Sequence, residues 1–336
     1  MVGIAIIGCG AITEHRHAPE CHHNANINLC GFFDINQDRC REFAEQYSCK
    51  AYSTYEEVLN DPSVDGVIIC TANRFHCEMT LQAFAHGKHV LCEKPIAVTL
   101  EEAESMIAAA DKAEKYLMVA HNQRFEPLNR KIKEILDSGK MGRIISFRTI
   151  FSHGGPEGWS VEKSNATWFF NKKQAGLGAL GDIGIHKADL IHWLINDDIK
   201  YITAKVLTLD KKTPDGELIG LDDNAICILE SKSGIVGTLE ASWTHYGKGY
   251  NETTLYCENG IIEANRYSDD PITLLMRDGS REVIRVEDCD SGMSAAFASC
   301  IINHRSPEVD GEEGKKALEI VLKCVESSKL NARVAL

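Results

Sequence analysis

The first third of the chain alternates short apolar runs with longer segments in which apolar residues recur every three or four positions. Such runs predict buried strands, and the longer segments predict helices. Strands are expected at 3–7, 29–33, 66–70, 89–92 and 117–120, and helices at 37–47, 75–85 and 100–115. Strands joined by helices are typical of a parallel sheet, so the pattern predicts a doubly wound α/β domain over residues 1–122.

Residues 123–336 have a different rhythm. Helices are expected at 128–136, 178–194, 294–303 and 312–328, and many short apolar stretches separated by turns predict strands between them. This order predicts an α+β domain with helices on one face of a mostly antiparallel, open sheet. The other sheet face needs a cover, and a second copy of the chain would supply one, so we expect a homodimer or homotetramer.

Composition narrows the class of protein. The chain has 336 residues with 36 Lys and Arg against 49 Asp and Glu, a net charge of −13 that disfavours nucleic acid as a partner. Its 13 cysteines are odd in number and none stands in a CxxC pair, which indicates reduced thiols. Neither a signal peptide nor an apolar run long enough to cross a membrane is recognisable, so we expect a cytoplasmic protein.

A glycine turn follows the first predicted strand. Gly8, Cys9, Gly10, Ala11 and Ile12 stand between that strand and a predicted helix, with Thr13 where a third Gly or Ala is usual. Gly8 permits a tight turn, and Gly10 lets the backbone approach a pyrophosphate at the helix N-terminus. Because of this context we interpret the turn as a dinucleotide site rather than an ordinary Gly-rich turn.

An acidic residue at the end of the second strand bears on the choice of dinucleotide. Asp34 can accept hydrogen bonds from the adenosine ribose and would repel a ribose phosphate, which favours NAD over NADP. Arg39 lies nearby and leaves NADP open as the cofactor.

Polar residues also follow two later strands. Thr71, Ala72, Asn73 and His76 come after the third strand, and Glu93, Lys94 and Pro95 come after the fourth, at the sheet edge where such folds bind ligands. An ammonium held there could position a substrate hydroxyl and stabilise a developing alkoxide. From spacing alone, a surface lysine before a helix is an equal alternative.

The glycine-rich segment 178–190 contains a candidate acid/base pair. Asp182 and His186 are four residues apart, so one helical face would carry both and the carboxylate could orient the imidazole. A capping Asp and a packed His are the alternative, and Asp189 could be a buried packing residue.

These fragments resemble a known family when taken in order. The motifs GCGAIT, TANRFH, EKP, HNQRF and GDIGIHKADL, followed by LDDN, ASW and DGEEG, are similar to the family of glucose-fructose oxidoreductase, inositol 2-dehydrogenase and rhizopine-catabolism oxidoreductases (Gfo/Idh/MocA). The resemblance covers nearly the whole chain. It implies an NAD(P)-binding Rossmann domain, a second domain whose open sheet lies in an oligomer interface, and a sugar or polyol substrate.

The resemblance also implies roles for individual residues. Lys94 would contact the reacting hydroxyl and the nicotinamide ribose, with Lys94–Pro95 a candidate cis bond, while His186 would be the general base and Asp182 its partner. The cofactor would be lined by Thr71, Asn73, His76 and Glu93, with Asn122 near the nicotinamide.

Two further points concern the substrate pocket. Gln123 stands where several polyol-oxidising members have a basic residue, so an inositol substrate is not implied. His153 and Trp168 are candidate sugar contacts beside Lys94, Asp182 and His186, with loop or core packing as the alternative. The histidines at 15, 17, 22 and 23 lack matching ligand spacing, so no metal site is expected.

The sequence therefore predicts an NAD(P)-dependent oxidoreductase that moves hydride between a CH–OH group and nicotinamide. Two alternatives stay open at this point. One is a redox-neutral enzyme that uses bound NAD transiently while it processes a glycoside. The other is a sensor of dinucleotide with the same fold and no catalysis, since fold does not determine function.

Overall fold

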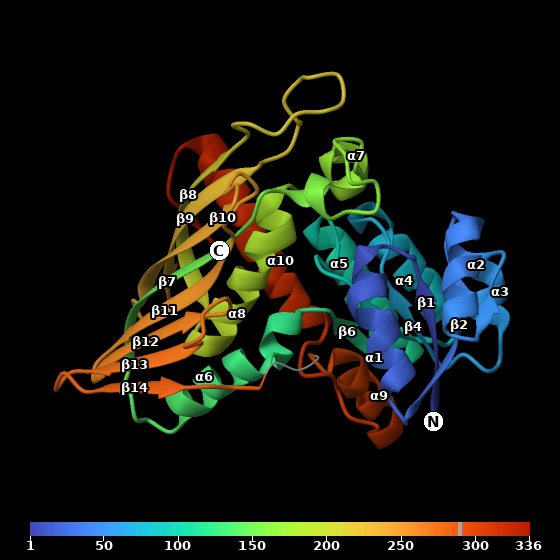
Figure 1. Ribbon diagram of the computed structural model, residues 1–336, viewed down its shortest axis with the longest axis horizontal. Helices are drawn as coiled ribbons and strands as arrows, with labels where there is room; N and C mark the ends of the chain where they lie inside the picture. Colours follow the sequence, from blue (N-terminus) through green and yellow to red (C-terminus); the bar gives the residue numbers. More distant parts are fainter. Residues whose placement is uncertain (288–290) are drawn as a thin grey trace.

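A parallel sheet forms the N-terminal part of the computed structural model, which describes residues 1–287 and 291–336 (Figure 1). Its strand order is β3-β2-β1-β4-β5-β6, which is the order of a Rossmann domain. The order reverses direction between β1 and β4, and a crevice opens beyond the carboxyl ends of the strands at such a reversal. The strands are β1 Val2–Ile7, β2 Ile27–Phe33, β3 Lys50–Ala51, β4 Gly66–Ile69, β5 His89–Cys92 and β6 Leu117–Val119.

Helices connect these strands and cover both faces of the sheet. They are α1 Ala18–His23, α2 Gln37–Gln46, α3 Tyr55–Asn60, α4 His76–Ala85 and α5 Leu100–Ala113. The five predicted strands and three predicted helices are present within a few residues of their expected ends. The elements β3 and α3 were not predicted, because segments of two and six residues are too short to show a period.

The second sheet has nine strands in the order β14-β13-β12-β11-β7-β10-β9-β8-β15. Among the described pairs only β7 and β10 run parallel, so the predicted mostly antiparallel sheet is confirmed. The strands are β7 Ile144–Ser152, β8 Ile199–Leu207, β9 Asn224–Ser231, β10 Val236–Ser242, β11 Tyr250–Cys257, β12 Gly260–Asn265, β13 Ile272–Met276, β14 Arg281–Ile284 and β15 Val334–Ala335.

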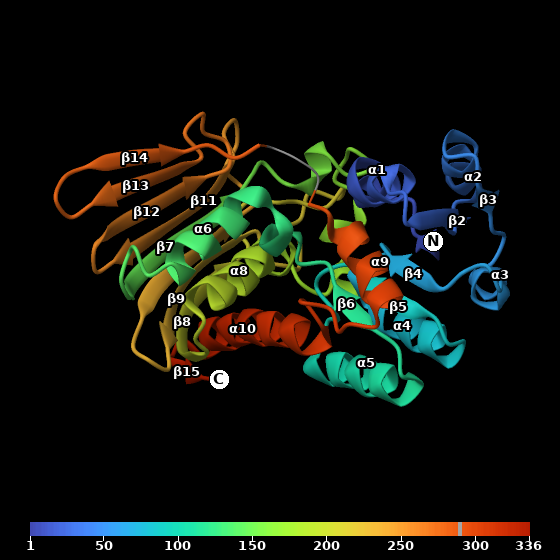
Figure 2. The same ribbon diagram turned by 90° about the horizontal axis from the view of Figure 1, so that it is seen from below.

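One face of this sheet packs against α6 Pro127–Asp137, α8 Ile185–Ile195 and α10 Gly311–Leu330 (Figure 2). The opposite face carries exposed apolar side chains, among them Ile226, which is 60% exposed, and Ile228. The homo-oligomer expected from such a face stays a prediction. Within the described residues, no helix is long and apolar enough to cross a membrane.

The end of the chain returns to the first sheet. Helix α9, Met293–Asn303, packs against α1 and β1, and Phe297 lies in one apolar cluster with Ile4 and Ile68. The short helix α7, Lys172–Ala175, lies in the long connection between β7 and α8. The division of the chain at residue 122 stays a prediction, since α9 comes from beyond it and packs on the first part.

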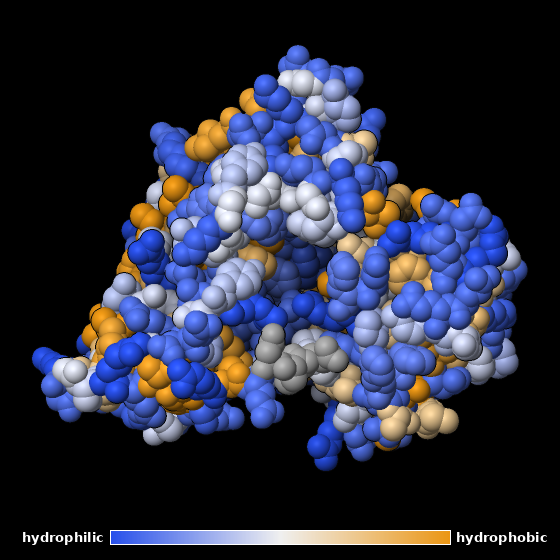
Figure 3. Space-filling model, in the orientation of Figure 1, coloured by the Kyte–Doolittle hydropathy of each residue, from blue (hydrophilic) through white to orange (hydrophobic). Residues whose placement is uncertain are grey.

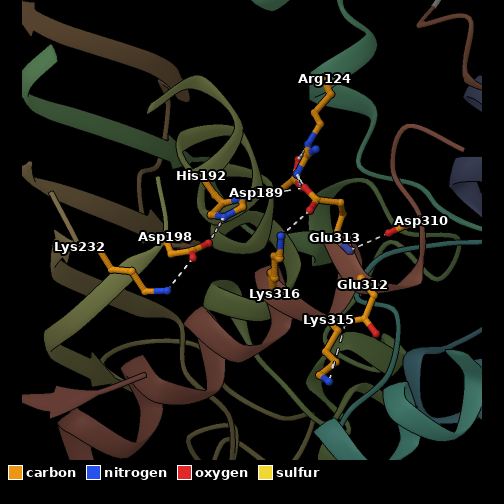
Figure 4. Close-up of polar contacts among 10 residues, drawn as sticks. All are labelled: Arg124, Asp189, His192, Asp198, Lys232, Asp310, Glu312, Glu313, Lys315 and Lys316. Carbon is orange, nitrogen blue, oxygen red and sulfur yellow. Dashed lines mark hydrogen bonds and ion pairs between the residues drawn. The ribbon is translucent and has the colours of Figure 1, made fainter. Parts of the chain in front are cut away.

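An ion cluster fixes the segment after β6 to α8 and α10 (Figure 4). Arg124 follows β6 and donates to both carboxylate oxygens of Asp189 in α8, at 2.9 and 2.6 Å, and to Glu313 in α10 at 2.8 Å. Arg124 and Asp189 are both buried. A buried guanidinium needs such partners because its charge has lost water. Asp189 is therefore a packing residue, the alternative that the sequence left open.

Removal of this guanidinium should destabilise the fold. Arg124→Met leaves the Asp189 carboxylate buried without its partner, so we expect a loss of about 3–5 kcal/mol in the free energy of unfolding. Arg130→Met is the matched control, because Arg130 pairs with Glu308 at 2.6 Å at the surface, where such pairs contribute about 0–1 kcal/mol. Urea denaturation of both variants measures the difference. Equal losses would contradict the structural role of Arg124.

Candidate active site

The two parts enclose a cavity of about 590 Å³. In the space-filling view a hollow lined by hydrophilic residues opens between the lobes (Figure 3). Its walls come from the ends of the parallel strands on one side and from β7, β11 and the segment before α8 on the other. A site of this kind can hold a ligand between the two parts.

The glycine turn after β1 forms one end of the cavity. Gly8 has φ +100°, and a Cβ there would lie 2.6 Å from the carbonyl oxygen of Cys70, so only glycine fits. At Gly10, by contrast, a Cβ would meet no atom within 4 Å, and the backbone faces the cavity. Thr13 stands in place of the third small residue and donates from Oγ1 to the Gly8 carbonyl oxygen at 2.6 Å, which fixes the turn.

The acidic residue beyond β2 is held by the same turn. The Asp34 carboxylate accepts from the backbone N–H of Cys9 at 2.7 Å and from that of Asn36 at 2.7 Å. Arg39 donates to the Cys9 carbonyl oxygen and pairs with Glu14 at 3.3 Å. Each carboxylate oxygen of Asp34 keeps one lone pair for another donor. The arrangement fits the ribose hydroxyls of a dinucleotide.

A buried histidine joins the loops after β4 and β5. His76 contacts the Pro95 carbonyl oxygen at 2.8 Å and the Thr71 carbonyl oxygen at 3.1 Å, and burial lowers its pKa. The Lys94–Pro95 bond is cis, as the resemblance implied. His76 thus sets the positions of both loops, while Thr71 lines the cavity with a buried hydroxyl that no described residue bonds.

The side chain of Glu93 is held by His17, which follows the glycine turn in the chain. The imidazole Nε2 of His17 lies 2.7 Å from Glu93 Oε1, and the Lys94 backbone N–H donates to Oε2 at 3.1 Å. Burial opposes ionisation of Glu93, but the His17 contact and the nearby charges of Lys94 and Arg16 together lower its pKa to about 2. Glu93 is therefore a carboxylate at any physiological pH.

Lys94 bridges the cleft. Its Nζ donates to the Asp182 carboxylate at 2.8 Å and to the Asp182 carbonyl oxygen at 3.0 Å, across 88 positions of sequence. The other carboxylate oxygen of Asp182 accepts from Trp243 Nε1 at 3.2 Å. Two of the three ammonium hydrogens are thus engaged, which leaves one donor for a ligand in the cavity.

The contact predicted between Asp182 and His186 is replaced by this one. No hydrogen bond joins the two side chains among the described residues. The two carboxylate oxygens of Asp182, which lies in the π-helical turn Leu180–Gly184, bond to Lys94 and Trp243 instead. Asp182 orients Lys94 instead of the imidazole.

The glycines of the segment 178–190 allow close packing against neighbouring backbone and side chains. A Cβ at Gly178 would lie 2.0 Å from the Asp222 carbonyl oxygen, and one at Gly184 would lie 3.1 Å from Ala241 Cβ on β10. The Asp222 carboxylate also accepts from the N–H groups of Gly178 and Leu180 at 3.1 and 2.7 Å, and burial raises its pKa to about 6. The segment can therefore press against the sheet and present Asp182 to the cleft.

His186 lies close enough to Lys94 for the charge of the ammonium to act on the imidazole. It is buried, it lines the cavity, and its Nδ1 has no hydrogen-bond partner among the described residues. Burial first, and the charges of Lys94 and other neighbours second, lower its pKa well below the ordinary value. The imidazole is therefore neutral at neutral pH and free to accept a proton.

Most predicted site residues meet in this cavity. Those that line it are Gly10, Ala11, Ile12, Thr71, Asn73, Glu93, Lys94, Asn122, Gln123, His153, Trp168, Asp182 and His186. Gly8, Cys9, Asp34, Arg39, Ala72 and His76 do not line it; Gly8, Cys9, Asp34 and Arg39 form the adjacent turn, and His76 supports the loops from behind.

The sequence reasoning missed several wall residues, namely Arg16, Glu126, Phe151, Trp159, Phe169, Asn251, Arg266 and Tyr267. Most lie in the second part, where no short motif marks a pocket. The Asp182 contact of Trp243 was also missed, although the ASW motif containing it was noted. Among the described residues no group of His, Cys, Asp and Glu side chains could hold a metal ion.

Comparison with known proteins yields two family models and many relatives. Residues 2–121 match the model described as oxidoreductase family, NAD-binding Rossmann fold, and residues 129–263 match the GFO/IDH/MocA C-terminal domain. The 1,5-anhydro-D-fructose reductase of Ensifer adhaerens is 29% identical over 83% of this chain and 82% of its own. The myo-inositol 2-dehydrogenase of Thermotoga maritima is 26% identical over 94% and 92%, respectively.

A solved structure has the same fold. Levoglucosan dehydrogenase in complex with NADH and levoglucosan superposes with a TM-score of 0.89 at 24% identity, over 99% of both chains.

The electrostatic coupling at the centre of the cavity can be measured directly. In Lys94→Met the pKa of His186 should rise, because one positive charge that opposes protonation is gone, yet burial should keep it below the ordinary value. NMR titration of the imidazole Cε1–H signals reports this shift. His89, whose pKa burial and Lys115 lower to about 4, is the internal control and should not move. An unchanged His186 titration would contradict the coupling.

Proposed function

Because this chain belongs to the Gfo/Idh/MocA family of oxidoreductases, whose N-terminal domain binds NAD, we propose that it transfers hydride between NAD and a CH–OH group of a sugar or polyol, with Lys94 and His186 at the reacting centre. The observation that carries the proposal is the Lys94 ammonium, which Asp182 holds in the cleft at 2.8 Å. A fixed cation beside the glycine turn is suited to a hydroxyl that develops negative charge.

Several observations support the fit of the cofactor. Gly10 leaves room for a pyrophosphate, the Asp34 carboxylate has lone pairs left for ribose hydroxyls, and Thr71 offers a buried hydroxyl without a partner. When bound, NAD accepts a hydride in alcohol oxidation and returns it in reduction. The Asp34 carboxylate favours NAD over NADP as the cofactor, and the nearby Arg39 leaves NADP as the alternative.

The residues around the reacting centre have separate tasks in this proposal. Lys94 donates a hydrogen bond to the substrate oxygen and lowers the energy of negative charge there. The neutral His186 accepts the hydroxyl proton as the hydride leaves the carbon, so the oxygen carries partial negative charge beside the Lys94 ammonium until the carbonyl has formed. Asp182 positions Lys94, and Glu93 with His17 fixes the backbone that carries it.

Polar wall residues suit a substrate rich in hydroxyls. Asn122 donates to Glu126 at 2.8 Å, and Glu126 pairs with Arg266 at 2.5 Å, so three side chains that line the cavity are already ordered. The relatives named above act on an anhydrosugar and on an inositol, and the levoglucosan dehydrogenase was solved with an anhydrosugar bound. Gln123 and His153 are proposed as further hydroxyl contacts and Trp168 as an apolar one.

Replacement of the ammonium should lower turnover. Lys94→Ala removes the donor that stabilises the alkoxide, so kcat should fall by about 100-fold or more. Nicotinamide absorbance and chromatography of the sugar, across a panel of sugars, polyols and inositols, detect both net oxidation and redox-neutral conversion.

The matched control is Lys88→Met, at the opposite end of β5, where Nζ donates only to the carbonyl oxygens of Asp61 and Val64. Its kcat should stay close to that of the unmodified protein. Near-normal kcat in Lys94→Ala would contradict the assignment of Lys94, and NADH binding without turnover of any sugar would favour a sensor.

A second substitution tests the cofactor site. Gly10→Ala adds a methyl group that meets no protein atom within 4 Å, so the fold should be retained while the group occupies the space of the pyrophosphate. We expect NADH binding to weaken by about 10-fold or more, measured by fluorescence titration, with NADPH in parallel.

Gly220→Ala is the control, because its Cβ would make only ordinary contact at 3.7 Å, with a Lys172 side chain outside the cavity. Equal NADH affinity in the Gly10 and Gly220 variants would contradict this placement of the cofactor.

A further inference from the structure

A continuous series of aromatic rings leads outward from the reacting centre. The His186 ring lies 5.9 Å from that of Phe151, which lies 6.1 Å from His153, which in turn lies 6.1 Å from Trp159. All four line the cavity. The series therefore forms one wall that starts at His186 and extends three ring-to-ring steps away from it.

The wall changes from buried to exposed along its length. His186 is buried, Phe151 and His153 are partly exposed, and Trp159 is 41% exposed at the outer end. Trp159 meets His153 and Phe169 in T-shaped contacts at 6.1 and 5.0 Å, and neither ring stacks flat on the indole. An exposed tryptophan at the mouth of a polar cavity offers an apolar surface to the CH groups of a sugar ring.

The loop that carries Trp159 is anchored rather than loose. Lys211 is buried and donates from Nζ to the Gly154 carbonyl oxygen at 2.6 Å and to the Glu157 carboxylate. The carboxylate of Asp223 in turn fixes the Lys211 backbone N–H at 2.8 Å. The buried Lys211 ammonium in this loop is compensated by the Glu157 carboxylate, which favours an uncharged ligand at this end of the wall. A platform that is ordered beforehand costs less entropy on binding.

His153 can donate a hydrogen bond to a substrate hydroxyl that lies between the inner and outer ends of this wall. Its Nδ1 accepts from the Gly155 backbone N–H at 3.0 Å, so the neutral ring carries its proton on Nε2. Burial, and the charges of Lys211 and Lys94 after it, lower the pKa of His153 despite the opposing effect of Asp182. The imidazole therefore presents a fixed N–H donor in the middle of the wall.

We propose that the substrate is a neutral glycoside with at least two rings. One ring would react beside Lys94 and His186, and the next would stack on Trp159. The inference rests on the proposed function and adds the substrate class. A free monosaccharide or polyol would fill the inner end alone and make no use of Trp159.

Substrate comparison in three proteins tests this inference. The unmodified protein, Trp159→Ala and Trp159→Phe are assayed with NAD on glucose, methyl glucoside and the neutral disaccharides cellobiose, maltose, trehalose and sucrose. The inference predicts that one disaccharide has a higher kcat/KM than the monosaccharide.

In Trp159→Ala, kcat/KM for that disaccharide should fall by about 10-fold, the equivalent of about 1.4 kcal/mol, mainly through KM. The value for the monosaccharide should change by less than about 2-fold, and Trp159→Phe, which keeps a ring face, should retain most of the preference. Thermal denaturation and NADH titration confirm that the variants are folded.

Two results would overturn the inference while the proposed function stands: disaccharides no better than the monosaccharide, or equal losses on both substrates in Trp159→Ala. Failure of every sugar, followed by both nicotinamide absorbance and chromatography, would overturn the proposed function and this inference with it.

Discussion

An ammonium group that is largely shielded from water needs a charged partner, and the Lys94 ammonium, whose side chain is 16% exposed, is paired by a carboxylate from the other part of the molecule. This contact determines where the cleft closes, because the end of β5 and the turn before α8 have to meet within hydrogen-bond distance. Asp182 is itself fixed by Trp243, which directly follows β10, so the antiparallel sheet positions the charge that the parallel sheet carries. The Lys94–Asp182 pair therefore forms only when both parts are folded and joined.

The other buried contacts support that geometry. His17 and Glu93 tie the glycine turn to the Lys94 backbone, and His76 ties the loop after β4 to Pro95. On the opposite side, the close approach of Gly178 to Asp222 lets the π-helical turn press against the sheet. Groups held in this way need little rearrangement when a ligand binds, which is the condition under which electrostatic stabilisation is most effective.

The fold and half of the site follow from local signals in the sequence. Gly8 and Gly10 reveal the turn because Gly8 has a positive φ that favours glycine and Gly10 keeps the backbone open to the cavity, and strand ends such as Thr71 and Glu93 follow from the apolar runs before them. The partner of Asp182 could not be predicted, since Lys94 is 88 residues away and meets it only in the folded chain. Trp159 was missed for a similar reason: the loop that carries it is held by Lys211, which bonds Gly154 and Glu157 from more than 50 residues away.

The central claim is that a carbon-bound hydrogen passes from a sugar to nicotinamide at the Lys94 centre. The most direct test is a single turnover of the NAD-loaded protein with its best sugar deuterated at the reacting carbon, followed by mass spectrometry of the cofactor. The account predicts deuterium on the nicotinamide ring, whether or not the reaction ends in net oxidation. Conversion of the sugar with no deuterium on the cofactor would contradict it.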